Sequence, residues 1–138
     1  MSVSQLAVFL ENKAGRLAEV TRVLGDAGVS IRGFSVADTS EFGILRLIVD
    51  RPDAARDSLR GRGFTVHRSE VVCARIPDVP GGLASVLEVL GARGINIEYM
   101  YPIGIALIVF GIEALQEASR ALEQSPVEML CDEDIRLL

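Results

Sequence analysis

The sequence lacks most of the residues from which metal and catalytic sites are built. It has one histidine, His67, and two cysteines, Cys73 and Cys131, which form no Cys-x-x-Cys pair. This set is too small for a zinc site, and the cysteines are typical of reduced thiols in a cytosolic protein. There is also no Ser/His/Asp or Cys/His arrangement, no P-loop and no dinucleotide-binding fingerprint. We therefore expect no metal, no cofactor and no catalytic residue, and we predict that the chain is not an enzyme.

Long apolar runs and clusters of basic residues are missing as well. Apolar runs such as 103–110 are short, and none approaches the length of a membrane-spanning helix. Residues 1–5 show no basic segment followed by an apolar core, so no signal peptide is visible. The formal net charge is −5, whereas nucleic-acid binders usually carry a basic patch. These features predict a cytoplasmic protein with neither a membrane nor a nucleic acid among its partners.

What the sequence does contain is an internal repeat. Residues 12–31 align with residues 78–97 at a constant offset of 66 without a gap, and nine of the twenty aligned positions are identical. Such a match is hard to obtain by chance, and a duplicated module is its simplest explanation. We therefore expect two units, 1–68 and 70–138, with residues 68–70 too short to form a flexible linker.

Both copies predict the same order of elements, βαββαβ. Apolar residues recur at helical spacing after a short first strand, and Gly28 and Gly94 follow the last turn, where glycine costs least as a left-handed cap. The residues 41–43 and 102–104 are expected to be hairpin connections. The other expected strands are 29–37, 44–49 and 64–67 in the first copy, and 95–101, 105–110 and 127–131 in the second. Second helices near 52–60 and 113–123 complete an α+β fold of two ferredoxin-like units, antiparallel sheets with helices on one face.

The start of each copy resembles an ACT domain. The family pattern is an Asp or Asn, two residues, Gly, a spacer and Leu, then an amphipathic helix and a Gly-(Ile/Val)-x-Ile strand. Nearly the whole chain is similar to tandem ACT proteins of the amino-acid-binding type, although most ACT units regulate a linked catalytic domain and none is recognised here. The segments that carry the resemblance are Leu10–Leu17, Gly28–Ile31 and Phe42–Arg46 in the first copy, and Ile76–Leu83 and Gly94–Tyr101 in the second.

The turn before the first helix of each copy is the candidate ligand site. A helix N-terminus offers unpaired N–H groups and partial positive charge, which suits a carboxylate, and glycine lets a ligand approach the backbone. The first loop is more polar than the second and is the preferred one. The resemblance implies a pocket at an interface where this loop faces a second strand of another unit. We expect Tyr99 or the Phe42-Gly43 turn to line its far side. The predicted ligand residues are Asn12, Lys13, Ala14, Gly15, Arg16, Leu17, Phe42, Gly43 and Tyr99, and those of the second loop are Asp78, Gly81, Gly82 and Leu83.

Each of these residues also has a plainer interpretation. Asn12 and Asp78 stand where a helix-capping side chain is common, and Gly15 and Gly81 suit a turn. Tyr99 either lines a cleft or packs an interface between subunits. The choice between these interpretations stays open at this level.

The function predicted from the sequence is that of a small regulatory protein that senses a free amino acid. The alternative is a protein-interaction or oligomerisation module without a ligand. A homodimer is expected because sheet edges need cover and the chain ends in the apolar residues Ile135, Leu137 and Leu138. A metabolic enzyme is a further candidate partner.

Overall fold

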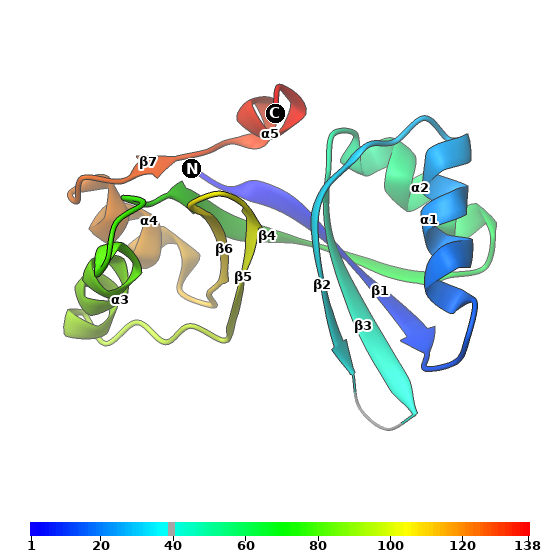
Figure 1. The fold of residues 1–138 in the computed structure, drawn as a ribbon, viewed down its shortest axis with the longest axis horizontal. Helices are drawn as coiled ribbons and strands as arrows, with labels where there is room; N and C mark the ends of the chain where they lie inside the picture. The colour runs from blue at the N-terminus through cyan, green and yellow to red at the C-terminus, as the bar shows by residue number, and fades with distance from the viewer. Residues whose placement is uncertain (39–40) are drawn as a thin grey trace. The chain divides into compact units, whose positions relative to one another are not determined.

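The computed structural model describes residues 1–38 and 41–138, and its elements follow the repeat (Figure 1). The first copy forms β1 (Val3–Glu11), α1 (Arg16–Asp26), β2 (Ile31–Asp38), β3 (Phe42–Val49), α2 (Pro52–Gly61) and the start of β4 (Thr65–Arg75). The second copy adds α3 (Gly82–Ala92), β5 (Tyr99–Gly104), β6 (Leu107–Gly111), α4 (Leu115–Glu123) and β7 (Glu128–Met129). A short helix that the sequence did not predict, α5 (Asp132–Arg136), follows β7. The predicted α+β class with two ferredoxin-like units is confirmed.

The chain divides into two compact units, and each is described here by itself. The first unit comprises Ser4–Ser69 together with Ile135–Leu138, and the second comprises Glu70–Asp134 together with Met1–Val3. The change from one unit to the other falls inside β4, so residues 68–70 belong to a strand. The expected ranges 1–68 and 70–138 differ from this division at the chain ends, where each terminal segment is grouped with the opposite repeat.

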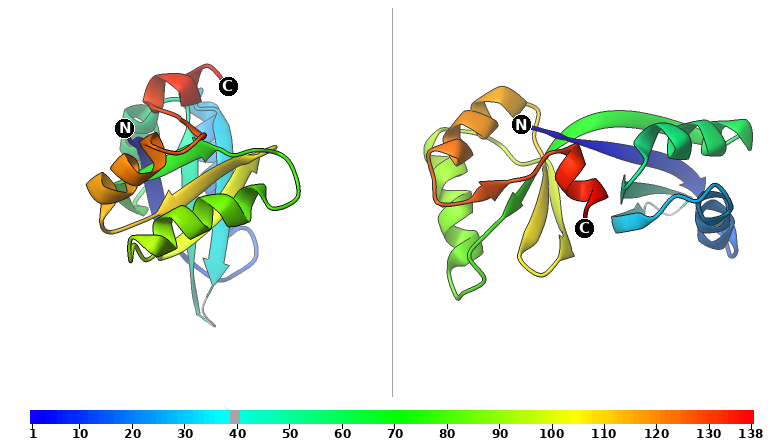
Figure 2. Two further views of the ribbon diagram at one scale, coloured as in Figure 1. Left: turned by 90° about the vertical axis from the view of Figure 1, so that its left-hand side faces the viewer. Right: turned by 90° about the horizontal axis from the view of Figure 1, so that it is seen from above.

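The sheet of the first unit has the order β2-β3-β1-β4. Leu6 of β1 lies opposite Leu47 of β3 in an antiparallel pair, and opposite residues of such a pair share one face of the sheet. Both side chains are buried with Val20 and Leu24 of α1 and Leu59 of α2 in one apolar core. The two helices therefore cover this face of the sheet (Figures 1 and 2).

The second unit repeats this arrangement with the order β5-β6-β4, and β7 pairs with the other side of β4. Val72 of β4 lies opposite Phe110 of β6, and both are fully buried. They share a core with Leu90 of α3 and Leu122 of α4. Both units end their first helix as predicted, because the glycine that follows, Gly28 or Gly94, has a positive φ of 72° or 69°.

Several predicted boundaries were wrong. The segment 102–104 is the end of β5 rather than a connection, and the turn to β6 comes at residues 105–106. Phe42 and Gly43 likewise open β3 instead of linking two strands. The strand expected at 95–101 begins only at Tyr99, and the strand expected at 127–131 is reduced to two residues. Among the described residues, no helix is both long enough and apolar enough to cross a membrane.

Candidate functional site

The loop between β1 and α1 is held at its start by backbone hydrogen bonds. The Asn12 N–H donates to the Glu41 carbonyl at 2.9 Å, and the Lys13 N–H donates to the Glu11 carbonyl at 2.9 Å. Gly15 is the N-cap residue of α1 and has φ +90° and ψ −14°. Side chains disfavour this left-handed conformation, so the loop needs glycine at the point where the helix begins.

The helix-capping interpretation of Asn12 and Asp78 was wrong. The N-cap positions of α1 and α3 are occupied by Gly15 and Gly81, and within residues 1–38 and 41–138 no side chain makes a capping hydrogen bond at either helix. Asn12 and Asp78 are both exposed, three residues before these caps. In the part of the chain that the structure describes, the first N–H groups of α1 therefore have no side-chain acceptor. The Arg16 N–H donates to the Lys13 carbonyl at 3.4 Å, and the N–H groups that follow it are the ones offered to a ligand.

A small hollow, called here the loop hollow, lies beside this helix start. Its volume is about 90 Å³. It brings together five of the predicted ligand residues, whereas the exposed Ala14 and Gly15 complete the loop without lining the hollow. Its wall consists of Leu10, Glu11, Asn12, Lys13, Arg16, Leu17, Val36, Gly43 and Leu45.

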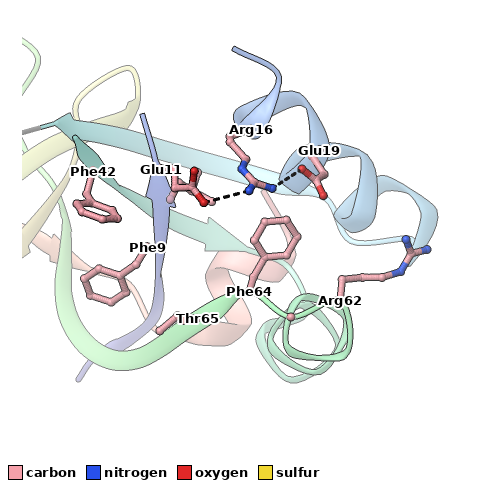
Figure 3. A pocket seen from close by; sticks show the side chains of 10 residues that line it. Phe9, Glu11, Arg16, Glu19, Phe42, Arg62, Phe64 and Thr65 are labelled. Carbon is pink, nitrogen blue, oxygen red and sulfur yellow. Dashed lines mark hydrogen bonds and ion pairs between the residues drawn. The ribbon is translucent and has the colours of Figure 1, made fainter. Parts of the chain in front are cut away.

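A second hollow, of about 320 Å³, shares Leu10, Glu11 and Arg16 with the loop hollow (Figure 3). Phe42, a predicted ligand residue, lines this second hollow and not the first. The figure shows the Arg16 guanidinium held between the carboxylates of Glu11 and Glu19. The ion-pair distances are 3.2 Å to Glu11 and 3.0 Å to Glu19. The hydrogen bond to Glu19 and the charge of Glu11 raise the pKa of Arg16, so this group stays cationic.

Sequence reasoning missed both carboxylate partners of Arg16. Glu19 was within reach of prediction, because it lies three residues after Arg16 on the same helix. Glu11 reaches Arg16 only because the loop folds back, and no periodic pattern signals that. The sequence analysis also missed Phe64. This residue follows α2 and lines the second hollow beside Arg16 (Figure 3).

A third hollow, of about 310 Å³, lies between α1 and β2 and is called here the apolar trough. The sequence analysis did not predict the apolar trough, although it named one of the residues that line the trough, Leu17. Phe34 and Val36 of β2 are opposite Leu47 and Leu45 of β3, so all four side chains are on the helix-bearing face. The lining residues are Leu17, Thr21, Ile31, Arg32, Gly33, Phe34, Val36, Leu45 and Leu47.

The second loop ends in the same left-handed glycine but follows a different backbone path and presents a different surface. Gly81 has φ +82°, close to the value at Gly15. The position of Arg16 is taken by Gly82, which is buried, and the Pro77 carbonyl fills the space that a Cβ atom there would need. Leu83 is half-buried and packs against the core of the second unit. The second helix start therefore has no counterpart of the Arg16 guanidinium.

Tyr99 and Tyr101 pack within the second unit. Their rings are stacked with centroids 6.4 Å apart and an interplanar angle of 13°. The Tyr99 ring lies against the backbone of Gly111, where any Cβ atom would overlap it. Tyr99 belongs to the second unit, and its part in a ligand site stays a prediction.

The chain is similar to known proteins in both sequence and fold. A family model described as an ACT domain pair matches residues 1–137. The crystal structure of a protein from Bacteroides thetaiotaomicron has 39% sequence identity and a TM-score of 0.95, and the match covers 100% of this chain and 98% of that one. No curated protein matches the sequence.

Two aspartate kinase structures have the same fold. The regulatory subunit from Thermus thermophilus, in a ligand-free form, matches with a TM-score of 0.64 and 18% identity over 88% of this chain and 91% of that one. Aspartokinase III from E. coli, in complex with lysine and aspartate, matches with a TM-score of 0.54 and 18% identity. That match covers 89% of this chain and 30% of the longer enzyme. Both similarities concern the fold alone.

Proposed function

The chain belongs to the family of ACT domain pairs, and from this premise we propose that it is a regulatory protein that binds a free L-amino acid at its first loop. The observation that carries the proposal is the uncapped start of α1 beside the polar loop hollow. A helix start with free N–H groups favours an anion such as the ligand carboxylate. Two proteins that share the fold support regulation by amino acids, because one is the regulatory subunit of an aspartate kinase and the other is an aspartokinase in complex with lysine and aspartate.

The polar groups around the loop hollow match the two charges of an amino acid. The Arg16 guanidinium and the first N–H groups of α1 are donors for the carboxylate. The Asn12 side-chain oxygen and the Glu11 carboxylate are acceptors for the ammonium group. The Lys13 Nζ atom lies 3.6 Å from Glu11 Oε2 and adds a further positive charge to the wall of the loop hollow. A zwitterion therefore finds partners of both signs within one loop.

The energies show why several of these groups are needed. One helix end contributes only about 0.3–1 kcal/mol toward a bound charge. Micromolar affinity requires about 8 kcal/mol. Charge-assisted hydrogen bonds contribute about 1.5–3 kcal/mol each, so Arg16, Asn12 and Glu11 have to act together with the helix start. Cover from another unit, with Tyr99 as the predicted residue, is the remaining part of the proposal.

The first loop is the preferred site because the second lacks the central cation. Gly82 replaces Arg16, and Val79 replaces Lys13. We extend the proposal to assembly and output: the protein is expected to be a homodimer and to act on a metabolic enzyme. No catalytic step is assigned to the chain.

The test is a thermal-shift screen of the twenty amino acids at millimolar concentration. A ligand that binds only the folded state at a hundredfold excess over its Kd adds about 2.7 kcal/mol. For a chain of this size, this should raise Tm by roughly 5–10 °C. If no amino acid shifts Tm, the sensor proposal fails and the ligand-free interaction module takes its place.

A further inference from the structure

The apolar trough shares part of its wall with the loop hollow. Leu17, Val36 and Leu45 line both spaces. A molecule whose charged end lies in the loop hollow therefore has the trough as the adjoining space for its remaining atoms.

The sizes of the two spaces indicate how such a molecule divides between them. Ligand pockets usually measure about 300–1,000 Å³. The loop hollow, at about 90 Å³, is well below this range, whereas the trough, at about 310 Å³, falls within it. The loop hollow thus suits the ammonium and carboxylate groups, and the trough suits a side chain of considerable size.

The surface of the trough is strongly apolar although much of it is open. Phe34 is 62% exposed, Val36 48% and Leu17 45%, and these three flank the buried Leu45 and Leu47. Phe34 and Val36 are exposed although they lie on the helix-bearing face, because β2 is at the edge of the sheet in its unit. Covering them with an apolar group removes apolar surface from water and is favourable.

The polar side chains of the trough are already engaged. The Thr21 hydroxyl lies 2.9 Å from the Leu17 carbonyl oxygen and donates to it. Arg32 donates to the carbonyl groups of Ile135 and Arg136 at 3.3 and 3.0 Å and to the Ser30 hydroxyl at 3.2 Å. A neutral polar ligand side chain would therefore lose water on a wall that offers it few partners, which is unfavourable.

From this juxtaposition we infer that the ligand is an amino acid with a bulky apolar side chain, of the leucine, isoleucine, methionine or phenylalanine kind. The inference rests on the proposed function, because it takes the loop hollow as the site of the charged groups. The ammonium and carboxylate contacts are common to all amino acids, so the trough alone sets the preference. Small and polar amino acids bind more weakly, because the trough gives them less apolar contact.

The experiment is isothermal titration of the full chain with leucine, phenylalanine, glycine, serine and aspartate. Burial of a leucine-sized side chain contributes enough for a preference of about tenfold or more over glycine. The variant Phe34→Ser removes part of the trough and should weaken leucine binding several-fold. Met100→Ser is the matched control, because Met100 is the repeat counterpart of Phe34 on β5 and is 43% exposed. It should bind leucine as the wild type does.

The outcomes separate this inference from the proposed function. If amino acids bind but glycine, serine or aspartate binds as tightly as leucine, the inference is overturned and the sensor function stands. The same conclusion follows if Phe34→Ser and Met100→Ser bind leucine equally well. If no amino acid binds the wild-type chain, the proposed function itself fails. In that case, a loss of self-association in Phe34→Ser would show that a second copy of the chain covers the trough.

Discussion

The carbonyl group of Pro77 occupies the space that a side chain on Gly82 would need. This contact closes the second loop over the first turn of α3 and explains why the two repeats differ at this position. In the first repeat, the same position holds Arg16, whose side chain reaches outward to Glu11 and Glu19. The two copies thus share a left-handed glycine before the helix, but they differ in the path of the loop and in what each helix start presents to solvent.

This contact makes Gly82→Ala strongly destabilising. A Cβ atom would overlap backbone, which cannot move aside as a flexible side chain can, and overpacking typically costs about 1–3 kcal/mol. Gly91→Ala is the matched control in the same helix, because nothing lies within 4 Å of its Cβ position. It should stabilise the fold by about 0.5–1 kcal/mol. Urea unfolding measures both, and equal effects of the two changes would contradict the Pro77 contact.

The two loop glycines allow a controlled test of which loop binds. Gly15 and Gly81 have φ values of +90° and +82°, and nothing lies within 4 Å of either Cβ position. Gly15→Val and Gly81→Val should therefore carry similar conformational strain and lower Tm by similar amounts. Only Gly15→Val should abolish the ligand-induced rise in Tm, because its branched side chain blocks approach to the helix start. A rise that disappears only in Gly81→Val would place the site in the second loop.

Arg16→Gln tests the cation at the centre of the site. Exposed ion pairs contribute little to folding, so unfolding should change little even though two ion pairs are lost. Amino-acid affinity should fall roughly tenfold or more, because a charge-assisted hydrogen bond to the ligand is removed. Arg22→Gln, on an exposed position of the same helix, is the control and should bind normally. Unchanged affinity in Arg16→Gln would remove Arg16 from the site.

The repeat was sufficient to predict the fold, because helix spacing and glycine positions coincide in two copies. The wrong strand boundaries come from residue types that occur both in turns and in strands. Pro102 was interpreted as a turn residue, but β5 is the edge strand of its sheet, and edge strands are where proline is tolerated within a sheet. The true turn contains Ala106 at φ +59°, a conformation rarely adopted by residues other than glycine.

Only the part of the candidate site formed by consecutive residues could be predicted from the sequence. The run from Asn12 to Leu17 was found because its residues are consecutive. The apolar trough depends on the register of β2 with β3, which sets Val36 opposite Leu45. A shift by one residue would turn Phe34 and Val36 to the other face. Sequence periodicity alone does not fix that register, and so the trough became visible only in the structure.

The proposed homodimer can be tested by measuring the molecular mass in solution. β2 and β5 are edge strands of their units' sheets, and exposed edges favour pairing with a further chain. Light scattering at tens of micromolar should therefore give a mass of about twice 14.9 kDa. Dilution should shift the mass toward that of one chain. A single-chain mass at the highest concentration would argue against the dimer.

The two cysteines should differ in reactivity toward a thiol reagent. Burial raises the pKa of the Cys73 thiol to about 12, and the thiolate is the reactive form. At pH 8, the native protein should therefore react rapidly only at Cys131, which is half-buried. Both thiols should react in denaturant, and Cys131→Ser should abolish the rapid phase. Rapid reaction of two thiols in the native protein would contradict the burial of Cys73.

The same pKa shift predicts how stability responds to alkaline pH. The unfolded thiol titrates near its ordinary value of 9.0, whereas the folded thiol keeps its proton up to about 12. Below pH 9, both states are protonated and the contribution of the buried neutral thiol is fully present. As the pH rises from 9 toward 12, the unfolded state alone loses its proton, so the free energy of unfolding falls. Cys73→Ala removes this titration, and its stability should decline less steeply over that interval than the wild type when both are unfolded in urea. Parallel declines would show that other groups cause the alkaline loss and that Cys73 ionises normally.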